Sequence, residues 1–176
     1  MDLRVQKILS LAAGILFILP VYILLHEGGH ALIALLCGAR ITEFNVLGAY
    51  MRYEGGTFSQ AGLSLFHIGG MLLPLLVSVV YMLTYRSKTT SIFYRIFSFI
   101  SLLFPIGAVL AWVIVPLLYL SGQAPVDDDV TKFINSSSLS PWLVFLGAIL
   151  LFAGCVFIAL KKKIVQNYWT ALKCGE

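Results

Sequence analysis

The chain has 176 residues, of which 60% are hydrophobic and only 11% are charged. An ordinary soluble domain carries roughly 25% charged residues. The composition therefore indicates an integral membrane protein and excludes collagen-like, coiled-coil, disordered and disulfide-framework proteins. The net charge is +4, but the basic residues lie at segment ends and form no aromatic-interleaved patch, so we expect no nucleic-acid partner. We expect one polytopic membrane domain over residues 1–176.

Four apolar stretches are long enough to cross about 30 Å of hydrocarbon, which takes roughly 20 helical residues. The first begins after a charged stretch, as a signal peptide does, but it has no small-x-small cleavage site, so we expect an uncleaved helix. The predicted fold is all-α and integral to the bilayer, with about four transmembrane helices. They run approximately over Ile8–Leu36, Ala61–Tyr85, Ile92–Leu120 and Trp142–Leu160.

A short β-hairpin is predicted between the first two spans. Residues 41–47 and 50–54 are rich in strand-forming side chains, with Gly48 between them and Gly55-Gly56 after them. This pattern is typical of two short strands joined by a turn. We therefore expect a hairpin over Ile41–Glu54 at the membrane edge.

The placement of basic residues predicts the orientation of the chain. With the N-terminus inside, the outer segments hold only Arg40, Arg52 and Lys132, and every loop agrees with the positive-inside rule. We therefore expect a multi-pass membrane protein whose N-terminus and C-terminus are both cytoplasmic. The cytoplasmic segments then hold Arg4, Lys7, Arg86, Lys88, Arg95, Lys161, Lys162, Lys163 and Lys173.

The first span contains one motif that carries chemistry, His26-Glu27-Gly28-Gly29-His30, which matches HExxH. On a helix, residues four apart share a face, so both imidazoles can hold one zinc ion, and Glu27 can act as general base on a metal-bound water. Ionisable groups inside a membrane cost roughly 2.5–3.5 kcal/mol each and are functional by default. Polar packing between helices explains one histidine but not this cluster, so the pattern favours a metal site.

A third ligand must come from elsewhere in the chain, because a catalytic zinc site has three protein ligands and one open position. The candidates are Asp127, Asp128 and Asp129, which follow the third span, and His67 in the second span. Topology favours the aspartates, since the outward end of the third span reaches the side toward which His26 leads. Asp129 also suits a helix N-cap, because Val130-Thr-Lys-Phe follows it.

The two glycines inside the motif also need a reason, since each costs about 1 kcal/mol relative to alanine in a helix. Gly28 and Gly29 leave a surface without side chains. Either a neighbouring membrane helix or an extended substrate can approach such a surface.

The stretch His26–Arg40 resembles the site-2 protease family of intramembrane zinc metallopeptidases, particularly its short four-span bacterial-type members. It matches the family's HExGH, followed by small and apolar residues and a glycine before a hairpin. Weaker similarity continues at Gly69–Pro74 and at the acidic run 127–129. The resemblance implies Zn²⁺ held by His26, His30 and an aspartate, which we assign to Asp128.

The expected function is hydrolysis of peptide bonds within or near the membrane by a zinc metalloendopeptidase. The expected partner is a membrane protein or membrane-anchored peptide as substrate, and the catalytic residue is Glu27. The alternative is a non-proteolytic zinc-binding membrane protein, either a scaffold or a metal carrier. The glutamate beside His26 favours catalysis, because a structural or transport site has no use for a base there.

Overall fold

The computed structural model describes residues 2–173, and residues 1 and 174–176 lie outside this range. Four of the described helices are long and apolar enough to cross a membrane. The predicted four spans and the hairpin between the first two are therefore confirmed, with boundaries that differ by a few residues. In chain order the elements are α1 (Leu3–Leu36), β1 (Ala39–Asn45), β2 (Tyr50–Gly55), α2 (Gln60–Thr84), α3 (Ile92–Leu120), α4 (Asp129–Ser137), α5 (Pro141–Lys161) and α6 (Ile164–Lys173).

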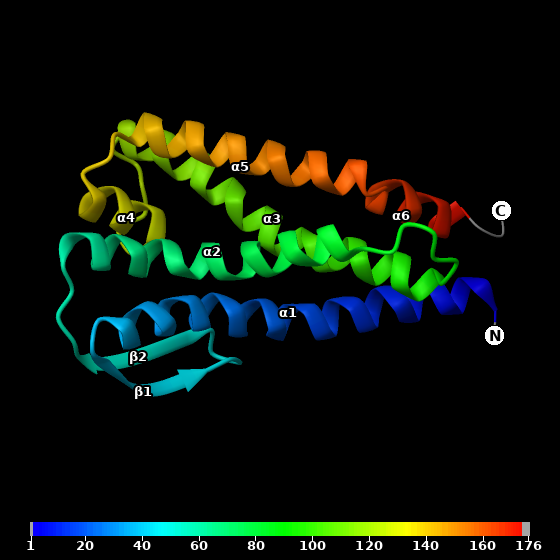
Figure 1. Ribbon diagram of the computed structural model, residues 1–176, viewed down its shortest axis with the longest axis horizontal. Coiled ribbons are helices and arrows are strands. Elements are labelled where there is room, and N and C mark those ends of the chain that lie inside the picture. The colour runs from blue at the N-terminus through cyan, green and yellow to red at the C-terminus, as the bar shows by residue number, and fades with distance from the viewer. Residues whose placement is uncertain (1, 174–176) are drawn as a thin grey trace.

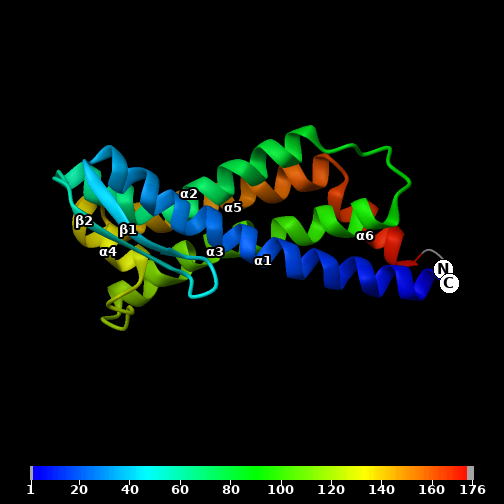
Figure 2. The same cartoon turned by 90° about the horizontal axis from the view of Figure 1, so that it is seen from below.

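The long helices form an elongated bundle with different small elements at its two ends (Figure 1). α1 packs against α2 and α3, and α5 packs against α3. The hairpin and α4 lie at one end, whereas α1 begins and α6 ends at the other, as Figure 2 shows from below. The short helices α4 and α6, which the apolar pattern does not predict, therefore close opposite ends of the bundle.

Large apolar side chains cover the outside of the bundle, as expected for a surface that faces lipid tails. Leu16 on α1 and Leu150 on α5 are 76% and 74% exposed. A soluble monomer rarely exposes a contiguous apolar surface of this kind. The bilayer is the solvent that accommodates it.

The main buried core fixes the position of α4 against the long helices. Val130 and Ile134 of α4 are buried among residues of α2, α3 and α5. The ring of Phe133 packs edge to face on Trp112 of α3, with centroids 5.1 Å apart. A hydrogen bond also joins α2 to α4, because the Ser64 hydroxyl lies 3.2 Å from the Ser136 hydroxyl. Asp129, the first residue of α4, is thereby held at a fixed position beside α2.

The two strands pair antiparallel, with one irregularity. Ile41 pairs with Tyr53 and Glu43 pairs with Arg52, so Thr42 is the extra residue of a bulge. In both views the hairpin runs back along the C-terminal part of α1 (Figures 1 and 2). The turn between the strands, which ends at Ala49 with a φ of 51°, therefore points back toward the middle of the bundle.

Candidate metal centre

His26 and His30 lie one turn apart on one face of α1. Their rings meet edge to face with centroids 5.0 Å apart, and their Nε2 atoms are 3.4 Å apart. His30 is 6% exposed. The spacing of four residues therefore places the two imidazoles on one helix face, as the motif predicts, and directs one nitrogen of each ring to the same point.

The orientation of His30 is set by a backbone carbonyl of α2. Nδ1 of His30 lies 2.7 Å from the carbonyl oxygen of Phe66. A carbonyl only accepts hydrogen bonds, so Nδ1 carries the proton and donates it. Nε2 is then the ring nitrogen that faces the site, where a metal ion would take the place of any proton it carries.

The third group at this point is the carboxylate of Asp129, the first residue of α4. Its Oδ2 lies 3.1 Å from Nε2 of His30 and 3.5 Å from Nε2 of His26. One atom from each of these three residues lies within 4.8 Å of the others. The group joins α1 to α4, which are far apart in the sequence.

Asp128, which we predicted as the third ligand, has another role in the structure. It is the N-cap of α4, and its Oδ1 accepts a hydrogen bond of 2.8 Å from the backbone N–H of Val130. A capping side chain folds back onto its own helix, so it does not turn toward the histidines. Asp127 is fully exposed and lies 3.7 Å from Lys132. Asp129, the residue for which the sequence suggested the cap, therefore lies beside the histidines, and Asp128 does not.

His67, the other sequence candidate, lies beside the carboxylate but outside the three-residue group. Its Nδ1 is 3.9 Å from Oδ1 of Asp129. That oxygen is not the one that faces His26 and His30. His67 is thus a neighbour of Asp129 and not a member of the donor set.

The electrostatics of the site favour an ionised Asp129. Burial on its own raises the pKa of this carboxyl, but hydrogen bonds from His26 and His30 and the charges of these rings act in the opposite direction and prevail. The pKa of Asp129 therefore lies well below its ordinary value. An ionised carboxylate is the form that binds a metal ion.

Two glycines of α2 explain how the helices come so close to the histidines. A Cβ atom at Gly69 would lie 2.8 Å from the carbonyl oxygen of Gly29, and one at Gly70 would lie 2.8 Å from Cε1 of His26 and closer still to Nε2 of His30. Gly29 therefore serves backbone packing between α1 and α2. Gly70 keeps open the space beside the imidazole nitrogens.

Glu27 lines a cavity next to the donor set. The cavity has a volume of about 290 Å³, and its other lining residues are Tyr22, Ile23, His26 and Ala49. Ala49 comes from the turn of the hairpin, which therefore reaches Glu27 of α1. Tyr22 is not part of the motif, although its position four residues before His26 places it on the same helix face.

The donor set suits a zinc ion chemically. Two imidazole nitrogens and one carboxylate oxygen are a ligand combination found in zinc hydrolases, which leave a fourth position open. Nε2 of His30 and the space beside Gly70 lie at the same point. The described residues thus fit a metal at the convergence of His26, His30 and Asp129.

A model of one protein family matches most of the chain. The family is described as Peptidase M50B-like, and the match covers residues 8–158. No curated protein and no solved structure shows significant similarity to the chain. The matched range contains His26, Glu27, His30 and Asp129.

Proposed function

This chain belongs to the Peptidase M50B-like family, the site-2 protease family that its motif resembles, and we propose that it is an intramembrane zinc metallopeptidase. The four apolar helices and a family of membrane proteases together make it a multi-pass integral membrane protein. One observation carries the proposal: the metal-binding atoms of His26, His30 and Asp129 lie within 4.8 Å of one another, next to Glu27. The proposed reaction is hydrolysis of peptide bonds within or near the membrane.

The proposed zinc ligands are Nε2 of His26, Nε2 of His30 and a carboxylate oxygen of Asp129. Zinc bound there supplies Lewis acidity, which polarises a peptide carbonyl and lowers the pKa of a bound water toward 7. The Phe66 carbonyl holds the His30 ring in the correct tautomer. The packing of α4 on α2 holds Asp129 in place.

Glu27 is proposed as the general base and then the general acid. Its carboxylate accepts a proton from the attacking water as the water oxygen bonds to the carbonyl carbon. It then delivers that proton to the nitrogen of the leaving amine as the C–N bond breaks. Glu27 is 9% exposed, and this burial limits access of bulk water to the reacting groups.

The hairpin is proposed to hold the substrate segment in an extended form. A transmembrane helix hides its amides in its own hydrogen bonds, so a substrate must unwind before hydrolysis. An extended segment can add to an exposed strand edge by main-chain hydrogen bonds. Ala49 at the hairpin turn borders the same cavity as Glu27, which supports delivery of the segment to this base.

The site is proposed to lie toward the non-cytoplasmic side, with both chain ends cytoplasmic. The three cations at the hairpin end each lie near a carboxylate: Arg40 near Glu54, Arg52 near Glu43, and Lys132 near Asp127. The other nine lysines and arginines belong to segments near the opposite end. The positive-inside rule counts lysines and arginines near the span ends and places the richer side in the cytoplasm, so nine against three support this orientation.

The test is to measure metal content and hydrolysis in one preparation. The purified full chain in detergent micelles is supplied with Zn²⁺ and a fluorescence-quenched single-span peptide whose membrane segment contains an Asn-Gly pair that weakens the helix. We expect one zinc per chain and cleavage by the wild type, but zinc without cleavage in Glu27→Gln. Zinc binding with no cleavage by the wild type would favour a scaffold or carrier instead.

A further inference from the structure

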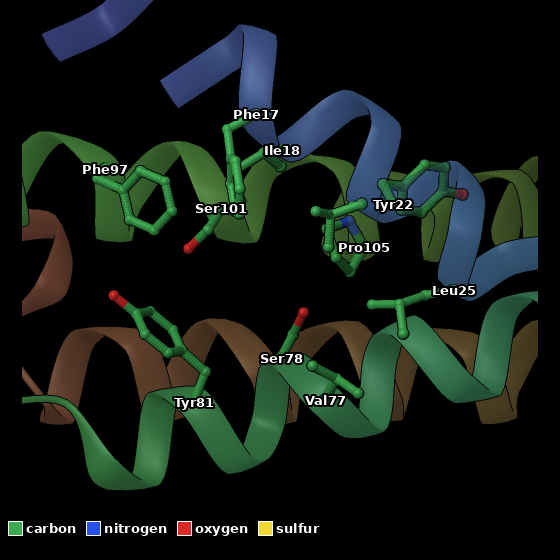
Figure 3. A pocket seen from close by; sticks show the side chains of 11 residues that line it. Phe17, Ile18, Tyr22, Leu25, Val77, Ser78, Tyr81, Phe97, Ser101 and Pro105 are labelled. Carbon is green, nitrogen blue, oxygen red and sulfur yellow. The ribbon is translucent and has the colours of Figure 1, made fainter. Parts of the chain in front are cut away.

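A second cavity lies between α1, α2 and α3 and is open on one side, where Phe17 and Val77 are 59% and 44% exposed (Figure 3). Its volume is about 190 Å³, and its walls are almost entirely apolar. Figure 3 shows Phe17 and Tyr22 of α1, Val77 of α2, and Phe97 and Pro105 of α3 around the space. The roles assigned to the candidate metal centre make no use of this cavity.

Tyr22 connects this cavity to the catalytic side of α1. It lines the apolar cavity and also the cavity that contains His26 and Glu27. The rings of Tyr22 and His26 are 5.9 Å apart, and Leu25, which directly precedes His26, lines the apolar cavity as well. A peptide positioned at Glu27 therefore has the apolar cavity beside it, on the other side of the Tyr22 ring.

The size and chemistry of the cavity indicate what it can bind. A dry apolar cavity of about 150 Å³ binds benzene, so about 190 Å³ accommodates a side chain such as leucine, methionine or phenylalanine. The Tyr81 and Ser101 hydroxyls face the cavity in Figure 3 but are already hydrogen-bonded, at 2.6 Å to the Ser98 hydroxyl and at 2.9 Å to the Ser98 carbonyl respectively. These two hydroxyls require no polar group from a ligand, and the Ser78 hydroxyl, which also points into the space in Figure 3, is a further polar group on the walls.

We propose that this cavity binds one bulky apolar side chain of the substrate, close to the scissile bond, and thereby selects where the membrane segment is cut. The inference rests on the proposed function for its catalytic context. The occupant is assigned to the substrate because Tyr22 belongs to both cavities. A pocket of this kind discriminates by volume, and a single methylene changes kcat/KM by about 10–200-fold.

The experiment fills the cavity and measures side-chain preference. Two single-span peptides differ only in phenylalanine or alanine at the residue beside the cleaved bond, which mass spectrometry locates first. Ser78→Leu and, from the opposite wall, Ser101→Leu each place a larger side chain in the cavity. The matched control is Gly107→Leu, which enters a separate apolar cavity between α3 and α5 where a Cβ meets no atom within 4 Å.

We expect the wild type to prefer the phenylalanine peptide by at least tenfold in kcat/KM. The ratio of phenylalanine to alanine should fall at least tenfold in both filling variants and stay unchanged in Gly107→Leu. Zinc content per chain verifies that each variant is folded. Hydrolysis with an unchanged ratio in Ser78→Leu and Ser101→Leu overturns the pocket and leaves the proposed function standing.

A binding measurement separates the pocket from catalysis. The inactive Glu27→Gln protein is irradiated with peptides that carry a photoreactive leucine at each position of the membrane segment in turn. Adducts on Tyr22, Val77 or Phe97 that disappear in Ser78→Leu support the pocket even if the wild type hydrolyses nothing. Adducts only elsewhere, or labelling of these residues by a photoreactive fatty acid and not by any peptide, overturn the proposal.

Discussion

Replacing Gly70 by alanine tests whether the histidine nitrogens are the metal ligands. A Cβ at residue 70 would lie 2.8 Å from Cε1 of His26 and closer still to Nε2 of His30, whereas ordinary contact begins at 3.4 Å. At least one ring must therefore move by more than about 0.5 Å, which exceeds the tolerance of about 0.2 Å in metal–ligand distances. Alanine is a better helix former than glycine, so α2 itself is not weakened.

We expect Gly70→Ala to lower zinc affinity by about 10–100-fold, the range seen when groups that orient ligands are altered. Hydrolysis should fall by at least about 100-fold, because misplacement by about 1 Å has that effect. Competition with a chromophoric chelator measures the affinity, and circular dichroism verifies helix content.

The matched control for this prediction is Gly28→Ala, inside the motif itself. There a Cβ meets only Leu73, at an ordinary contact distance of 3.8 Å. We expect its zinc affinity to equal that of the wild type. If Gly70→Ala also binds zinc as tightly as the wild type, the ion is not held at the Nε2 atoms beside residue 70.

Three further predictions concern the base, the third ligand and the orientation. Glu27→Gln should keep one zinc per chain and lose at least about 100-fold in hydrolysis; normal turnover would contradict its role. Asp129→Ala should lose zinc and activity together, whereas Asp128→Ala should keep zinc and lose about 1 kcal/mol of folding stability, because its helix cap is removed. Metal analysis and denaturation distinguish the two variants. The reverse pattern would make Asp128 the ligand, as the sequence predicted. In a background without the three native cysteines, Ser87→Cys should react with an impermeant reagent only from the cytoplasmic side and Gln123→Cys only from outside; opposite labelling would invert the chain.

The spans, the hairpin and the pairing of His26 with His30 could be predicted from the sequence because each follows from local spacing. Length and hydropathy define a span, and a separation of four residues defines a shared helix face. None of these features depends on distant contacts. The family could be identified from the same motif.

Which aspartate lies beside the histidines could not be predicted, because it depends on where α4 begins. Asp128 and Asp129 both suit the start of a helix, and a shift of one residue turns a side chain by about 100° around the axis. Val130 and Ile134 fix the rotation of α4 about its axis, because both are buried against the long helices. That packing is a tertiary effect, invisible in the spacing of the acidic run.

The backbone contact between Gly29 and Gly69 has a mechanical consequence. Because no side chain separates them, the backbones of α1 and α2 meet directly at their crossing and cannot approach further. Ser64 of α2 and Ser136 of α4 link α4 to this pair of helices, so the three candidate ligands lie on one packed unit. We expect a substrate segment to enter by displacement of parts outside this unit, and the hairpin turn at Ala49 is such a part beside Glu27. Opening of the site and retention of the geometry of the candidate ligands would thereby depend on different segments of the chain.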